Sequence, residues 1–431
     1  MLHLSWARFI LHVEVICFGV AAELTNLFLN NRLAEIGEHS VAAQLYINVD
    51  LMKEAIDSFI LAEDWAKAKK LAKQLDPAYE NYIESKYKDR LLKEGNVEQL
   101  ADIDIIGALD LLAEQGQWLR CIEKAKSHSA PVLHKYIALY ASHLLKDGFT
   151  IEALNLYKTH GAPAIAQNFN IYTRIATDIF GMPGTSGPEH FDLWMELRQM
   201  LFDLNKNLQA AIDVPVQSKA HFQNLLLVAH YYATRTACRQ VSSLKGIALK
   251  ISVALLRYTD VIPADKGFYE AGIDLREDGR VSEAFVFLNH YLDICEAIEE
   301  GEGQLVDHSD LVQTDFPSNI PLPNELYLRD EPHIHESIRE WVLTVSMDQN
   351  IDQTLPTDDR QLYESSLQIS EMPCVVSAYP IQESSLSFQS SSFKVNKDVW
   401  SKISMAAKIS PDSNVPNVIS FINQWCGAVT K

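Results

Sequence analysis

The helical fold is decided by residues 116–154, which read GQWLRCIEKAKSHSAPVLHKYIALYASHLLKDGFTIEAL. Two copies of one pattern lie in this stretch, Gln117-Trp118-x-x-Cys121-Ile122 and Gly148-Phe149-x-x-x-Ala153-Leu154. In each copy a bulky apolar residue precedes a small residue and a second apolar residue. A small residue lets a partner helix approach closely, and a large residue fills the remaining groove. The stretch therefore predicts helices that pack in pairs.

The same pattern extends on both sides of this stretch. It recurs as Asp64-Trp65-x-x-Ala68 and as Gly279-Arg280-x-x-x-Ala284-Phe285, and apolar residues recur at helical steps throughout 39–300. Cys121 and Ala153 are 32 residues apart, close to the 34-residue period of tetratricopeptide repeats. The other spacings are irregular, and an irregular all-α bundle is the alternative. We expect a mainly α fold, with a tetratricopeptide-like helix-pair α-solenoid over 39–300.

Composition excludes several classes of partner and compartment. The chain has 431 residues, 37 Lys and Arg against 57 Asp and Glu, and a formal net charge of −20. Phosphates and anionic lipids are bound by clustered basic side chains, so we expect no nucleic-acid partner and no docking on acidic membranes. The six cysteines form no CxxC pair, and Asn-x-Ser/Thr is absent. Both features favour a reducing, intracellular compartment.

The first 38 residues are treated as an unassigned apolar segment. Phe9–Ala22 is mostly apolar, but it contains His12 and Glu14 and is shorter than a membrane span. We expect a buried helix or a start that does not belong to the natural protein, with no direct membrane insertion; a signal or anchor is the less favoured alternative.

The character of the chain changes after residue 300. Residues 293–340 hold 13 acidic and 2 basic residues, and four prolines lie between 317 and 332. This composition predicts an extended, poorly packed acidic linker over 301–332. Within it, we expect residues 307–310 to lie along the last helices, with Asp310 or Ser309 capping a local turn, and hence protection from hydrogen exchange between that of a free linker and that of the helices. Linking helices are expected over 333–370, followed by a small α+β module over 371–431 with a return strand at 393–395 and helices at 397–408 and 415–425.

No motif for catalysis or for a cofactor is found. Phosphate-binding glycine motifs and HExxH are absent, and 184–187 (GTSG) reads as a loop because Pro188 follows it. His333 and His335 lie close in sequence, but two imidazoles do not make a metal site. We predict no catalytic, cofactor-binding or metal-binding residues and no cofactor.

Longer blocks of the sequence are specific enough to point to a family. They include 133–141 (LHKYIALYA), 229–235 (AHYYATR) and 341–349 (WVLTVSMDQ). The others are 108–110, 114–118, 121–122, 160–163, 167–172, 265–266, 268–273, 307–310 and 424–427. In this order the blocks resemble the C-terminal part of the intraflagellar transport protein 172 family.

The resemblance implies a non-catalytic interaction scaffold, a peripheral subunit of intraflagellar transport complex B that serves cilium assembly and maintenance. Its implied partners are the other complex B subunits and ciliary cargo, and its implied location is the cilium, at the axoneme and basal body. The family also carries N-terminal propellers, which this chain lacks. We expect a fragmentary gene model or a truncated product.

The C-terminal module resembles a U-box, a RING-like fold without zinc. The residues that carry this likeness, and that form the candidate partner-binding turn, are Pro373, Cys374, Ser377, Tyr379 and Pro380. Ala378 occupies the position where the intraflagellar transport protein 172 family usually has glycine. Alanine has fewer accessible backbone conformations than glycine, so this replacement restricts the conformation of the turn. The alternative function is that of a ubiquitin-pathway ligase or ubiquitin-binding module, with ubiquitin or an E2 as partner.

Overall fold

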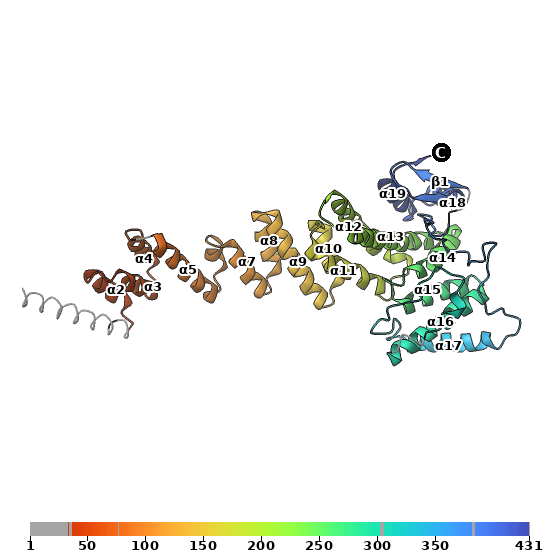
Figure 1. Ribbon diagram of the computed structural model, residues 1–431, viewed down its shortest axis with the longest axis horizontal. Coiled ribbons are helices and arrows are strands. Elements are labelled where there is room, and N and C mark those ends of the chain that lie inside the picture. The colour runs from red at the N-terminus through yellow and green to blue at the C-terminus, as the bar shows by residue number, and fades with distance from the viewer. Residues whose placement is uncertain (1–32, 34–36, 76, 302–305, 382–383, 431) are drawn as a thin grey trace, which may run out of the picture. The chain divides into compact units, whose positions relative to one another are not determined.

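The computed structural model describes residues 33, 37–75, 77–301, 306–381 and 384–430. Nearly all of the segment predicted for 1–38 lies outside the described residues. The mainly helical prediction is confirmed: the described chain consists of helices packed on their neighbours and a three-stranded antiparallel sheet near the C-terminus (Figure 1). The division of the sequence into five segments stays a prediction. In the described part of the chain, no helix is both long and apolar enough to span a bilayer.

The chain forms two compact units, one up to Tyr136 and one from Ile137 onward. The helices of the first unit are α2 (His39–Asn48), α3 (Met52–Leu61), α4 (Trp65–Ala72), α5 (Pro77–Glu94), α6 (Val97–Ala101), α7 (Ile105–Glu114) and α8 (Trp118–His128), and α9 (Ala130–Lys146) contains the division. Small side chains let these short helices meet. Ala68 of α4 is fully buried in one apolar cluster with Ala42 of α2 and Ala55 of α3, as its place in the sequence pattern predicts.

Local sequence sets where these helices begin and end. The side chains of Asp64, Asn96 and Asp104 accept hydrogen bonds from backbone N–H groups in the first turns of α4, α6 and α7. Gly116 follows α7 with φ +71°, a left-handed conformation that glycine adopts without strain. The starts of α4, α6 and α7 and the end of α7 are therefore set by interactions within a single helical turn.

The second unit begins with α10 (Thr150–His160), α11 (Phe169–Gly181) and the long pair α12 (Phe191–Ala210) and α13 (Val216–Arg239). It continues with α14 (Lys245–Ala254), α15 (Ala264–Glu277), α16 (Val281–Glu300) and α17 (Pro332–Ser346), and short 3₁₀ turns lie at 166–168, 188–190, 242–244, 255–258 and 309–311. The helices α15 and α16 pack closely at Gly272, where an added Cβ would lie 2.6 Å from Cγ of Leu288.

Residues 306–331 differ from the expected poorly packed linker. Leu311 and Leu328 are buried in the cluster formed by α15 and α16, and Phe316, Ile320 and Tyr327 pack against it. The N–H of Tyr327 donates to a carboxylate oxygen of Asp265 at 2.7 Å. The prediction of a poorly packed segment rested on its acidic residues and prolines. The apolar residues of the segment follow no helical or strand period, so the sequence did not indicate that they are packed.

The C-terminal module contains the strands β1 (Ser385–Phe388), β2 (Lys394–Asn396) and β3 (Val429–Thr430) in the order β2-β1-β3. Leu386 lies opposite Val395, and Ser387 lies opposite Thr430. The helices α18 (Lys397–Ile409) and α19 (Val415–Cys426) agree with the predicted helices to within one residue. Figure 1 shows the module beside α12 and α13, and α19 packs on α13.

Candidate functional site

The predicted partner-binding turn, residues 373–380, closes on itself. Pro373 and Pro380 pair as an isolated antiparallel bridge, and the N–H of Cys374 donates to the carbonyl of Tyr379 at 2.8 Å. Ala378 has φ +58°, in the left-handed region that disfavours side chains. The position where the family usually has glycine is therefore one where glycine would be free of strain.

Helices of the same unit cover this turn. Cys374 and Ser377 are at most 1% exposed, and Pro380 is half-buried. The Tyr231 hydroxyl of α13 donates to the Cys374 carbonyl at 3.2 Å, and Arg257 donates to the Ala378 carbonyl at 3.1 Å. A partner would reach most of the turn only if the module left these helices. That the turn binds a partner stays a prediction.

The module docks on α12 and α13 through rings and one buried cation. The Arg198 guanidinium lies 3.9 Å from the centre of the Phe421 ring, and the His230 and Trp425 rings are 5.5 Å apart. Arg198 is 2% exposed, and its Nε and Nη1 have no hydrogen-bond partner among the described residues. Burial lowers the pKa of Arg198 to about 9 and, with the nearby Arg198 charge, that of His230 to about 3. The interface therefore holds a guanidinium that forms no ion pair with any of the residues that the structure describes.

A buried ionic network ties α13 and α15 to the loop after α11. Arg235 and Glu270 form an ion pair at 2.7 Å, and the hydroxyl of Ser186 donates to Glu270. Lys266 donates to the carbonyls of Phe180 and Met182 at 2.6 and 2.9 Å. Burial would raise the pKa of Glu270, but the Arg235 and Lys266 charges lower it to about 2. Burial lowers the pKa of Lys266 to about 8. The network fixes the loop at 182–187, within which residues 184–187 were correctly predicted to be a loop.

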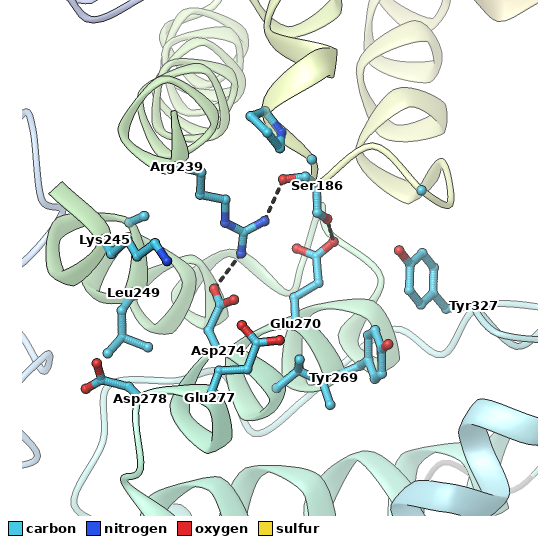
Figure 2. Close-up of a pocket in the computed structure, with 15 residues that line it drawn as sticks. Ser186, Arg239, Lys245, Leu249, Tyr269, Glu270, Asp274, Glu277, Asp278 and Tyr327 are labelled. Carbon is cyan, nitrogen blue, oxygen red and sulfur yellow. Dashed lines mark hydrogen bonds and ion pairs between the residues drawn. The ribbon is translucent and has the colours of Figure 1, made fainter. Parts of the chain in front are cut away.

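This loop forms one wall of a pocket of about 580 Å³. The other walls are the C-terminal end of α13, the start of α14, one face of α15 and Tyr327. Figure 2 shows the carboxylates of Glu270, Asp274 and Glu277 near Arg239 and Lys245. Arg239 donates to Asp274 and to the Ser186 carbonyl, each at 2.5 Å. The pocket is therefore polar on one side, and Leu249 and Ile273 add apolar surface.

The sequence reasoning missed this pocket. The α15 wall of the pocket contains three dipeptides spaced four residues apart, each ending in an acidic residue: Tyr269-Glu270, Ile273-Asp274 and Glu277-Asp278. Residues four apart share one helix face, so this repetition was a usable signal. The loop at 184–188 and Tyr327 lie far from α15 in sequence, and no local pattern could have placed them beside it.

The two histidines that lie close in sequence, His333 and His335, have different surroundings. Nδ1 of His335 lies 3.0 Å from the hydroxyl of Tyr291, whereas His333 is exposed. Within the described ranges, no group of three or more His, Cys, Asp or Glu residues could hold a metal ion.

The described residues thus define a mainly helical protein, with helices packed on their neighbours and a small α+β module docked on them. No family model matches the chain. It is 52% identical over 427 residues to the intraflagellar transport protein 172 homolog of Drosophila melanogaster, covering 95% of this chain and 24% of the relative. The homolog of Homo sapiens is 46% identical over 430 residues, covering 96% and 24%. The intraflagellar transport protein osm-1 of Caenorhabditis elegans is 34% identical over 409 residues, covering 92% and 23%.

The chain belongs to the intraflagellar transport protein 172 family. It spans about a quarter of the length of these curated relatives.

Proposed function

We propose that the chain is a non-catalytic scaffold segment of the intraflagellar transport train, required for cilium assembly and maintenance. The observation that carries the proposal is the identity of 46–52% to intraflagellar transport proteins over nearly the whole chain. Its partners are then other complex B subunits and ciliary cargo, and its location is the cilium, including the axoneme and basal body.

We further propose that residues 39–300 form a tetratricopeptide-like solenoid, the architecture that presents helix faces to partner proteins. The support comes from small residues of the repeated pattern. Ala68, Cys121, Ala153 and Ala284 are all fully buried, as close-packing positions between helices must be.

A chimera tests the scaffold function. The matching segment of the Drosophila relative is replaced by this chain, and the chimera is expressed in cells that lack the relative. We expect cilium number and length to recover, whereas the relative without the segment should fail. A chimera that is stable and enters the train but does not restore cilia would contradict the proposal.

A second candidate function rests on the C-terminal module. Met405 and Ile409, one turn apart on α18, are 63% and 71% exposed, and such apolar surface commonly meets another protein. The proposed partner is ubiquitin or an E2, by the likeness to a U-box. The test is in vitro ubiquitylation with E1, E2 and the full chain, with Met405→Asp and Ile409→Asp as matched variants. If the same amount of polyubiquitin forms with and without this protein, this candidate function is wrong.

A further inference from the structure

The pocket beside α15 holds charges that the fold does not neutralise. Arg239 pairs with Asp274, and Glu270 pairs with Arg235. Three other charged residues line the pocket: Lys245, Glu277 and Asp278. All three are exposed, and none forms an ion pair within the described part of the chain. Two carboxylates against one ammonium leave an excess of negative charge.

Two further features of the walls suit a cation on a long apolar stem. The rings of Tyr269 and Tyr327 have centroids 5.9 Å apart, and both line the pocket. Aromatic faces attract ammonium and guanidinium groups through their π electrons. Leu249 and Ile273 add apolar surface to the pocket lining. Lysine and arginine combine such a cation with a methylene chain that packs on apolar surface.

We propose that this pocket binds a lysine or arginine side chain from a peptide segment of a partner protein. The cation meets Glu277 and Asp278, and the methylene stem lies against Leu249, Ile273 and Tyr269. The volume of about 580 Å³ lies in the range of ligand-binding pockets and accommodates one long side chain with its neighbours. Lys245 repels the cation at one edge and so restricts where it can lie. The inference deepens the scaffold function and rests on it only for the claim that the occupant belongs to a protein.

The test uses the full chain with ¹³C-labelled Leu and Ile methyl groups, so that Leu249 and Ile273 report on the pocket by NMR. The probes are acetylated pentapeptides Gly-Gly-X-Gly-Gly amide with arginine, lysine, norleucine or glutamate at X. We expect the arginine and lysine peptides to shift both methyl signals, and the norleucine and glutamate peptides to leave them unmoved. Equal shifts with glutamate or norleucine would overturn the proposal.

Variants that change charge but little shape separate binding from folding. The double variant Glu277→Gln, Asp278→Asn should weaken binding of the arginine peptide at least tenfold. Glu340→Gln, an exposed carboxylate on α17, is the matched control and should leave it unchanged. Lys245→Glu should tighten binding, a gain that a merely damaged fold would not give. Unchanged affinity in the double variant would refute the assignment. Arginine amide that binds as tightly as the peptide would mean a small-molecule site.

The outcome is distinguishable from failure of the scaffold proposal. If the chimera restores cilia but the peptides do not bind, the pocket assignment alone is wrong. If the peptides bind as expected but the chimera fails while remaining stable, the scaffold proposal alone is wrong.

Discussion

Gly272 tests whether close approach of α15 and α16 holds the second unit together. A Cβ at this position would lie 2.6 Å from both Cγ and Cδ2 of Leu288, about 1 Å inside the usual carbon–carbon separation of about 3.5–4.0 Å. The backbone nitrogen of Leu288 would lie only 3.4 Å away, so the α16 backbone also stands close. Leu288 is fully buried and has little room to move. Gly272→Ala therefore forces a shift in the core.

The size of the effect is a difference of two terms. Overpacking a core costs about 1–3 kcal/mol, whereas replacing a helical glycine by alanine gains about 0.4–1 kcal/mol. We expect Gly272→Ala to lose about 1–2 kcal/mol of unfolding free energy. Gly246, in α14, is the matched control because nothing would lie within 4 Å of a Cβ added there. Gly246→Ala should be neutral or stabilising by about 0.5 kcal/mol.

The assay is urea unfolding of the full chain, followed by fluorescence and by hydrogen exchange in α15 and α16. Hydrogen exchange is needed because the chain has two units and a single transition is not assured. The double variant Gly272→Ala, Leu288→Ala should lose less than the sum of its single variants, by about 1 kcal/mol, because the clashing atoms are gone. If Gly272→Ala matches Gly246→Ala in stability, or if the two losses simply add, the close contact does not exist as described.

The remaining predictions concern charges buried in the second unit. Glu270→Gln should cost about 3–5 kcal/mol in urea unfolding, because Arg235 would stay buried without its carboxylate partner. Arg198→Met should raise the melting temperature by replacing an uncompensated buried cation with an apolar side chain; a fall would mean that the contact with Phe421 outweighs desolvation. The folded pKa of His230 is about 3, below its ordinary 6.5, so its contribution to stability is complete above pH 6.5 and is lost as the pH falls toward 3. At pH 5 the loss is about 2 kcal/mol, and His230→Gln should flatten this slope of stability against pH.

The sequence alone determined the elements whose causes are local. Helical periodicity, the capping side chain of Asp64 and the left-handed glycine at Gly116 all act within one or two turns of backbone. Helical periodicity was enough to predict the mainly helical character of the chain, and α18 and α19 were placed to within one residue. The repeated pattern also identified Ala68 as a buried contact between helices, because a small residue in a helix pair has few other uses.

The tertiary structure alone decided what meets across long distances in sequence. The pocket brings residues 184–188 of one loop beside α15 and Tyr327, and the turn at 373–380 lies against Tyr231 and Arg257. The burial of Arg198 and the packing of 306–331 likewise depend on distant partners. Local sequence encodes backbone preference and hydrophobic period. Contacts between distant segments depend instead on how all the helices pack together. No short stretch of the sequence encodes that packing, so these contacts could not be predicted from local patterns.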